Sequence, residues 1–411
     1  MKIYFDTLSL DTSNLNHLSS NGDNTHWIVS PGSIIMRRLD EINCKFESIN
    51  NVTDSGCYFI DVAGDPFWWA GVLKQSHVPK HHVLTLIPEH ILELVRQRKI
   101  RIIISGDKEG GPMINDEYDC FKSTTQAMIS KGLPAQSVLI LQGNRKIQQQ
   151  YELWLAETKS LRLFEVQYSC SFAMIFYNRS LPAEPVINES IKSATYAFNS
   201  LNRVYRSHRG AHCYYLVKHD LLQHGLVSCN EIRNYDRPAA DWNNITEHEF
   251  LLTLREHYPR YIDGDWSTEN AANQYNIDVY KNSLMSFITE TKFDEDVIFL
   301  TEKVFKPLVL GHPLILLASP GTLGSLKDLG FKIDWCGIDS SYNDIKDDKQ
   351  RFIKTHEILK WWIHLPREEK IEKIQLSMDT IQHNFDLVRS KNFYHEALRT
   401  ALNSSKEYFN A

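Results

Sequence analysis

"FLTEKVFKPLVLGHPLILL", residues 299–317, places an acidic and a basic residue side by side between two apolar segments. Thr301 is a good N-cap for a helix that begins at Glu302, because its hydroxyl can accept a bond from an amide of the first turn. The apolar run after Gly311 is typical of a buried strand. The stretch therefore predicts a helix over 301–311 and a strand after it, with Pro307 bending or shortening the helix.

The charged pair has two possible explanations, since charged groups are costly to bury unless something pairs with them. In the first, Glu302 and Lys303 are solvated residues that decorate a capped helix. In the second, an anionic ligand meets the free amides and the positive dipole end of that helix. Glu302 could then accept hydrogen bonds from two ribose hydroxyls, and Lys303 could meet a phosphate as a point charge.

Strands and helices alternate on both sides of this stretch. Apolar runs at 57–62, 100–105 and 137–142 predict strands, and the spacing between them predicts helices near 87–99, 119–131 and 147–157. Further along we expect a helix that ends at Gly225, strands over 284–290 and 297–300, and a helical tail from about 350. Such alternation predicts parallel sheets.

The predicted fold is therefore α/β and GT-B-like, with two Rossmann-type domains whose parallel sheets face a cleft and a C-terminal helical tail. A chain of 411 residues is longer than one core usually supports. A polar stretch near 181–190 is the best linker. We expect an N-terminal acceptor domain over 1–185, a donor domain over 190–375, and C-terminal helices over 376–411 that pack back on the first domain.

Composition excludes several function classes. The net charge of −6 argues against a broad nucleic-acid surface. The seven cysteines form no CxxC pair, which disfavours a disulfide framework or a zinc site. The sequence has neither a signal peptide nor a membrane span, so we expect a cytoplasmic protein of a bacterial or phage-infected cell. It also lacks a Gly-rich dinucleotide motif and a Walker motif.

The block "SFITETKF…VIFLTEKVFKPLVLGHPLIL" resembles the donor-site block of the α1,3-fucosyltransferase family. It is also similar to bacterial and phage-encoded glycosyltransferases with the pattern E-T-x-F…T-E-K-x-F-K-P. In this sequence the pattern starts with Glu290, Thr291 and Phe293 and ends with Lys306 and Pro307. The resemblance spans roughly residues 190–355. It implies a GT-B fold, a nucleotide-sugar donor in the C-terminal domain, and metal-independent, inverting transfer.

The sequence departs from the fucosyltransferase pattern at three points. Phe299 replaces a tyrosine that contacts the donor, Thr291 replaces an asparagine, and Gly311 and Pro313 are one residue closer than in the family. These departures put guanine nucleotide and fucose in question, whereas the use of a nucleotide sugar is unaffected.

A cluster of arginines precedes this block at Arg203, Arg206 and Arg209. A diphosphate leaving group that has no metal needs cations, and arginine provides them with bidentate geometry. The resemblance implies a diphosphate contact from this region, and a solvated basic turn is the alternative. The donor-side candidates are Arg203, Arg209, Glu290, Thr301, Glu302, Lys303 and Lys306.

The acceptor side needs a base that deprotonates the attacking hydroxyl. Glu109 and Asp65 lie in loops that follow predicted N-terminal strands, where open α/β sheets place their ligands. Trp68 and Trp69 could stack on an acceptor sugar or base. Each of these could instead be an ordinary turn residue.

No metal site is predicted, because the Asp263-Gly264-Asp265 triplet is typical of a turn and the histidines lack ligand spacing. The sequence leaves the acceptor open between a glycan and a hydroxymethylated base in phage DNA, which would be flipped out of the duplex. A non-catalytic nucleotide-binding or scaffold protein is the alternative from another class.

Overall fold

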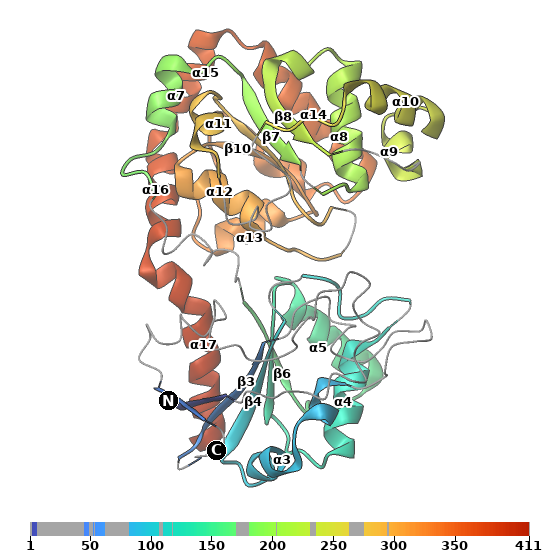
Figure 1. Cartoon of the computed structure of the whole chain (residues 1–411), viewed down its shortest axis with the longest axis vertical. Coiled ribbons are helices and arrows are strands. Elements are labelled where there is room, and N and C mark those ends of the chain that lie inside the picture. Colours follow the sequence, from blue (N-terminus) through green and yellow to red (C-terminus); the bar gives the residue numbers. More distant parts are fainter. Residues whose placement is uncertain are drawn as a thin grey trace. The chain divides into compact units, whose positions relative to one another are not determined.

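The structure, a computed structural model, describes most of the chain in two compact units. Unit 1 comprises Met1–Met174 and Tyr394–Ala411, and unit 2 comprises Ile175–Phe393. Each unit is described by itself (Figure 1). The described residues are 2–5, 45–48, 52, 54–61, 82–106, 110–116, 118–169, 181–202, 204–230, 236–262, 275–293 and 296–410.

Unit 1 is built on a six-stranded sheet of order β2-β1-β3-β4-β5-β6, with every pair parallel. Its elements are β1 (Lys2–Phe5), β2 (Lys45–Ser48), β3 (Gly56–Asp61), a 3-10 turn (Val83–Leu86), α3 (Glu89–Arg96), β4 (Ile100–Gly106), α4 (Cys120–Ser130), β5 (Val138–Gln142), α5 (Ile147–Thr158) and β6 (Glu165–Tyr168). The order reverses between β1 and β3, as in flavodoxin-like sheets.

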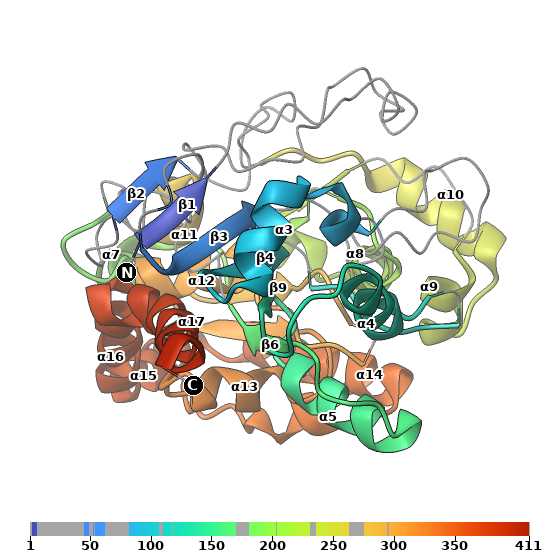
Figure 2. The same cartoon turned by 90° about the horizontal axis from the view of Figure 1, so that it is seen from below.

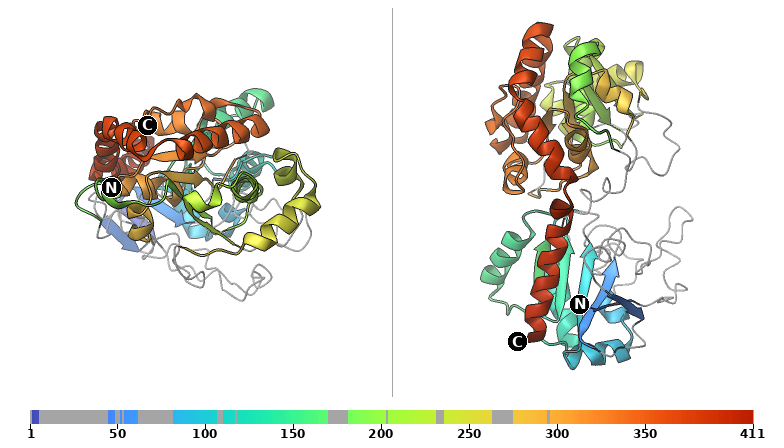
Figure 3. Two further views of the ribbon diagram at one scale, coloured as in Figure 1. Left: turned by 90° about the horizontal axis from the view of Figure 1, so that it is seen from above. Right: turned by 90° about the vertical axis from the view of Figure 1, so that its left-hand side faces the viewer.

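The two faces of this sheet are covered differently. Alternate strand residues such as Ile102 and Ile140 pack with α3, α4 and α5 into one core. On the other face lies α17 (Lys391–Asn410), which follows unit 2 in the chain and returns to unit 1 (Figures 2 and 3). The buried guanidinium of Arg101 fixes α17 by donating to the hydroxyls of Ser404 and Ser405 at 2.9 and 3.1 Å.

Unit 2 is built on a four-stranded parallel sheet of order β10-β9-β7-β8. Its elements are α7 (Ile187–Ser193), β7 (Phe198–Asn202), α8 (Ser207–Lys218), a 3-10 turn (Leu222–His224), β8 (Gly225–Cys229), α9 (Arg237–Trp242), α10 (Glu247–His257), α11 (Ile277–Lys281), β9 (Ser286–Thr289), α12 (Glu302–Leu310), β10 (Leu314–Leu317), α13 (Thr322–Asp328), a 3-10 turn (Ser340–Asp344), α14 (Asp348–His364), α15 (Arg367–Leu376) and α16 (Met378–Arg389). The predicted α/β class with two Rossmann-type parallel sheets is confirmed.

The helix and the strand that were predicted after Thr301 are both present in the structure. The Thr301 hydroxyl accepts from the Lys303 amide at 3.4 Å and caps α12, and Gly311 ends the helix at φ +64°. A Cβ at Gly311 would lie 2.4 Å from the Cβ of Pro185, so this position requires glycine for both its conformation and its contact. Pro307 lies inside α12 and is buried.

Two predicted elements are wrong. The helix expected to end at Gly225 ends at Lys218, because Asp220 adopts a left-handed conformation at φ +52° and turns the chain. Gly225 begins β8 instead. The segment 297–300, predicted as a strand, is buried but is not one of the four strands of the sheet, and it leads into the Thr301 cap.

Candidate functional site

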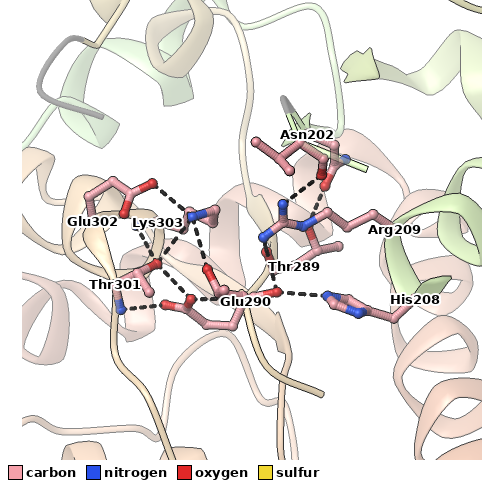
Figure 4. Close-up of polar contacts among 10 residues, drawn as sticks. Asn202, His208, Arg209, Thr289, Glu290, Thr301, Glu302 and Lys303 are labelled. Carbon is pink, nitrogen blue, oxygen red and sulfur yellow. Dashed lines mark hydrogen bonds and ion pairs between the residues drawn. The ribbon is translucent and has the colours of Figure 1, made fainter. Parts of the chain in front are cut away.

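The strand order of unit 2 places a ligand-binding position between β7 and β9. The chain leaves β7 toward β8 on one side, and later strands β9 and β10 add on the other side. In open α/β sheets the loops after two such strands diverge, and ligands bind in the crevice at their carboxyl ends. The described residues that follow these two strands carry most of the polar groups discussed below (Figure 4).

Glu290 follows β9 directly and is 1% exposed. Its carboxylate accepts from the Thr301 amide at 2.9 Å, from the Thr301 hydroxyl at 2.6 Å and from the Thr291 amide at 2.8 Å. Burial raises the pKa of Glu290, and the Lys303 charge and the two hydrogen bonds from Thr301 oppose that rise. Glu290 therefore ties the end of β9 to the N-cap of α12, and all of these contacts are internal.

Lys303 and Glu302 form an ion pair at the start of α12. The Lys303 ammonium lies 2.8 Å from Glu302 Oε1 and donates to the hydroxyls of Thr291 and Thr301 at 3.2 and 3.3 Å. The two side chains are 23% and 12% exposed. Burial alone would raise the pKa of Glu302, but the Lys303 charge and hydrogen bond, together with Lys306, lower it. Glu302 is thus a carboxylate at neutral pH, and both side chains reach solvent.

Arg209 comes from the first turn of α8, which follows β7, and is 2% exposed. Nη1 donates to the Val204 carbonyl at 2.7 Å, and Nη2 donates to the carbonyls of Thr289 and Glu290 at 3.4 and 3.2 Å. These bonds join the loops after β7 and β9. Among the described residues no carboxylate forms an ion pair with Arg209, and its Nε has no partner.

The charge of Arg209 therefore has no ion-pair partner among the described residues. Burial lowers the pKa of Arg209 to about 10, while the more distant Glu290 carboxylate acts in the opposite direction. The guanidinium stays protonated at neutral pH. A buried cation without a partner is unfavourable by itself. It becomes favourable when an anion binds beside it.

His208 lies next to Arg209 and is held neutral. Its Nε2 donates to the Glu290 carbonyl at 2.7 Å, and its ring stacks on Phe293 with centroids 5.3 Å apart. Because a carbonyl can only accept, Nε2 carries the proton. Burial, and after it the charge of Arg209, lower the pKa of His208 well below its ordinary value.

The structure brings five of the predicted donor-side residues to one region of unit 2: Arg209, Glu290, Thr301, Glu302 and Lys303. Lys306 lies one turn further along α12. The predicted residues Asp65, Trp68, Trp69, Glu109 and Arg203 lie outside the described residues, as does the triplet 263–265.

The sequence analysis missed three residues of this region: Asn202, His208 and Thr289. The Thr289 hydroxyl donates to Asn202 Oδ1, which links the ends of β9 and β7. Two polar residues on alternate positions of a short strand, Ser200 and Asn202, were the available signal, because they place polar groups on one buried face.

The described residues contain neither a metal-binding cluster nor a membrane-spanning helix. No group of three or more histidine, cysteine or acidic side chains there is placed to hold a metal ion. Within the same residues, none of the helices has the length and apolarity that crossing a membrane requires.

Comparisons with known proteins give no family. No family model and no curated protein matches the chain. Among solved structures, the N-terminal domain of Candida albicans trehalose-6-phosphate phosphatase aligns at 12% identity and TM-score 0.46, over 87% of this chain and 72% of that one.

Two synthases align in a similar way. The UDP-forming α,α-trehalose-phosphate synthase from Burkholderia vietnamiensis aligns at 12% identity and TM-score 0.38, over 80% of this chain and 71% of that one. The trehalose-6-phosphate synthase OtsA aligns at 12% identity and TM-score 0.40, over 91% and 75%.

Proposed function

We propose that unit 2 binds the diphosphate of a nucleotide sugar between β7 and β9, and that the protein is a GT-B-type glycosyltransferase. The observation that carries this proposal is the buried guanidinium of Arg209, which has no carboxylate partner among the described residues. An anion bound beside the guanidinium would offset the free-energy cost of burying its charge. The resemblance of the E-T-x-F…T-E-K-x-F-K-P block to glycosyltransferases gives that anion a chemical identity.

Other groups of the region complete the proposed donor site. Lys303 supplies a second cation, and the N-termini of α8 and α12 supply positive dipole ends. Arg203 follows the end of β7 directly in sequence and is proposed as a further diphosphate ligand, with Lys306 adding charge. Glu302 is proposed to accept from ribose hydroxyls, whereas Glu290 and Thr301 position the start of α12.

The acceptor is proposed to bind unit 1, where the strand order also reverses, between β1 and β3. In sequence Asp65, Trp68 and Trp69 follow β3, and Glu109 follows β4. Glu109, or Asp65 in its place, would take the proton of the acceptor hydroxyl. The oxygen would attack the anomeric carbon, the bond to the phosphate would break, and the nucleoside diphosphate would leave. This reaction inverts the anomeric centre and needs no metal.

A ligand panel tests donor binding. We would measure the thermal stability of the full chain with UDP, GDP, ADP, dTDP and CMP, and titrate each ligand that stabilises it. A ligand at 100 times its dissociation constant stabilises a protein by about 2.7 kcal/mol. We expect one nucleoside diphosphate to stabilise the wild type and CMP, with one phosphate, to stabilise it less.

Matched variants locate the site. Lys303→Ala and Glu302→Ala should lose this stabilisation. Lys354→Ala and Glu357→Ala are the controls, because they break an ion pair of 3.1 Å on the surface of α14 in the same unit. Equal losses in all four variants, or no stabilisation by any nucleotide, would remove the proposal.

Turnover then separates the enzyme from a binding protein. The matching nucleotide sugar should release nucleoside diphosphate faster with an acceptor than without one, and Glu109→Gln or Asp65→Asn should abolish that increase. Glycans and duplex DNA with hydroxymethylated bases are the two acceptor classes to offer. A chain that binds the nucleotide but neither transfers nor hydrolyses the sugar would be the non-catalytic alternative.

A further inference from the structure

A buried chain of hydrogen bonds runs from the candidate site into the helices behind it. It starts where the Thr289 hydroxyl donates to Asn202 Oδ1. Asn202 Nδ2 donates to the Ser200 hydroxyl at 3.1 Å, and that hydroxyl lies 3.0 Å from Nε2 of His212 on α8. His212 Nδ1 lies 2.9 Å from His356 Nε2 on α14, and His356 Nδ1 lies 2.8 Å from the Phe352 carbonyl.

The last acceptor fixes the direction of every bond. The Phe352 carbonyl can only accept, so Nδ1 of His356 carries the proton and Nε2 of the neutral ring accepts. His212 must therefore donate through Nδ1 and accept at Nε2 from the Ser200 hydroxyl. With that hydroxyl proton committed, Ser200 can only accept from Asn202, which leaves Asn202 Oδ1 for Thr289.

The residues of this hydrogen-bond chain are shielded from solvent. His212, His356 and Ser200 are fully buried, and Asn202 and Thr289 are 2% and 3% exposed. The Phe287 ring stacks on His212 with centroids 4.3 Å apart. The imidazoles are therefore fixed in one tautomer and one orientation, and with them the amide of Asn202.

We propose that His212, supported by His356, is a positioning residue for the candidate site. Through Ser200 and Asn202 it fixes Thr289 at the end of β9, and the carbonyls of Thr289 and Glu290 in turn hold Arg209 and His208. The functional readout of this inference rests on the proposed nucleotide site. The hydrogen-bond geometry from His212 to Arg209 and His208 does not depend on that site.

Unit 2 contains a matched control for this chain. The Ser286 hydroxyl lies 2.9 Å from Nδ1 of His312 and accepts from Asn199 Nδ2 at 3.2 Å. This second Asn–Ser–His cluster has the same chemistry and is equally buried, but it lies at the first residue of β9, at the opposite end from Thr289. Ser286→Ala therefore removes a hydroxyl with equivalent hydrogen bonds, as Ser200→Ala does, but it leaves intact the hydrogen-bond chain that leads from His212 to the site.

The first experiment records the tautomers by long-range ¹H–¹⁵N spectra of the full chain labelled at histidine. His212 and His356 should be protonated at Nδ1, because each donates through that nitrogen. His208 and His312 should be protonated at Nε2, because that nitrogen donates to the carbonyls of Glu290 and Ser283. An Nε2 proton on either His212 or His356 would overturn the proposal.

The second experiment compares Ser200→Ala with Ser286→Ala. We expect similar losses of thermal stability, but only Ser200→Ala should shift the resonances of His208 and of the Arg209 Nε–H group. Only Ser200→Ala should also weaken nucleotide binding, by about five- to tenfold, as expected for one lost hydrogen bond.

Each outcome decides one question. Equal effects of both variants on the His208 and Arg209 signals, or no effect of Ser200→Ala on them, would overturn the positioning role. If no nucleotide binds the wild type, the proposed function fails and these resonances alone decide the role of His212. If a nucleotide binds all three proteins equally, the proposed function stands and the positioning role is wrong.

Discussion

Two of the described arginines of unit 2 are buried, and their charged groups have different partners. Arg351 on α14 is fully buried and lies over the Phe293 ring at 4.3 Å. Its nitrogens donate to the carbonyls of Ala318, Ile345, Lys346 and Phe293, and Nη2 also lies 2.6 Å from the Asp348 carboxylate. Arg209 bonds three carbonyls, and no described carboxylate forms an ion pair with it.

The difference separates a structural arginine from a candidate ligand-binding one. Asp348 and four loop carbonyls compensate the charge of Arg351, so its environment is complete without a ligand. Arg209 fixes two loops in a similar way, but no described carboxylate pairs with its charge and its buried Nε–H group has no hydrogen-bond partner. Burial alone would therefore not distinguish the two residues. The charge balance around each one does.

Replacing each arginine by methionine should give the largest contrast in stability. Arg351→Met leaves several buried carbonyls without donors, and we expect it to lower the free energy of unfolding by about 4 kcal/mol. Arg209→Met removes the Arg209 donors to the Val204 and Thr289 carbonyls, while the Glu290 carbonyl keeps its bond from His208. It also removes a buried charge that has no described ion-pair partner, which offsets part of that loss. We therefore expect a loss below about 1 kcal/mol. Urea unfolding of the two variants measures both values.

Equal losses would break the comparison, because they would make Arg209 as structural as Arg351. Arg209→Lys provides a check, since it keeps the charge and loses the fork that joins the two loops. It should bind the proposed nucleotide better than Arg209→Met. A variant that unfolds outright at Arg209 would contradict the low value.

The helix at the centre of the site could be predicted from sequence because its signals are local. Thr301 and Gly311 define the two ends of α12 within eleven residues, and the apolar β10 follows at once. The apolar strands β4 and β5 of unit 1 were predicted for the same reason. These features depend on neighbours in the chain, so periodicity and capping rules find them.

The residues that build the rest of the site depend on distant partners. β7 reads FNSLN, and its polar side chains form hydrogen bonds with His212, Ser286 and Thr289, which are distant in sequence. No local sequence pattern predicts those partners. The sequence indicated Arg209 as a cation, but not that it would lie among carbonyls without a carboxylate. Charge balance is a tertiary property.

The pH dependence of stability should reflect the neutral His208 beside Arg209. Its pKa in the folded chain lies well below the ordinary 6.5 because of burial and the Arg209 charge. Between these two pKa values the unfolded chain binds a proton that the folded chain does not. Stability therefore falls as the pH drops below 6.5, and this residue should account for about 1 kcal/mol between pH 7.5 and 5.5.

His208→Gln tests this directly, because its amide can still donate to the Glu290 carbonyl. Urea unfolding at both pH values should show that the variant loses about 1 kcal/mol less than the wild type on acidification. His364→Gln, which removes an exposed imidazole from the end of α14, is the control. If His208→Gln lost as much stability on acidification as the wild type, His208 would accept a proton beside Arg209 in the folded protein. The description of a neutral His208 beside a charged Arg209 would then be wrong.

The smallest effect concerns the second cation of the site. Lys303, unlike Arg209, has a carboxylate partner, so its charge should behave as an ordinary ion pair without ligand. A double-mutant cycle of Glu302→Ala and Lys303→Ala should give a coupling of about 0.5–1 kcal/mol, and the more exposed Lys354–Glu357 pair should give less. Because the Glu302 pKa lies below its ordinary 4.5, the coupling should persist at pH 7 and disappear as the pH falls through that lowered value. A coupling near zero at pH 7 would place Lys303 with Arg209, as a second uncompensated charge at the carboxyl end of β9.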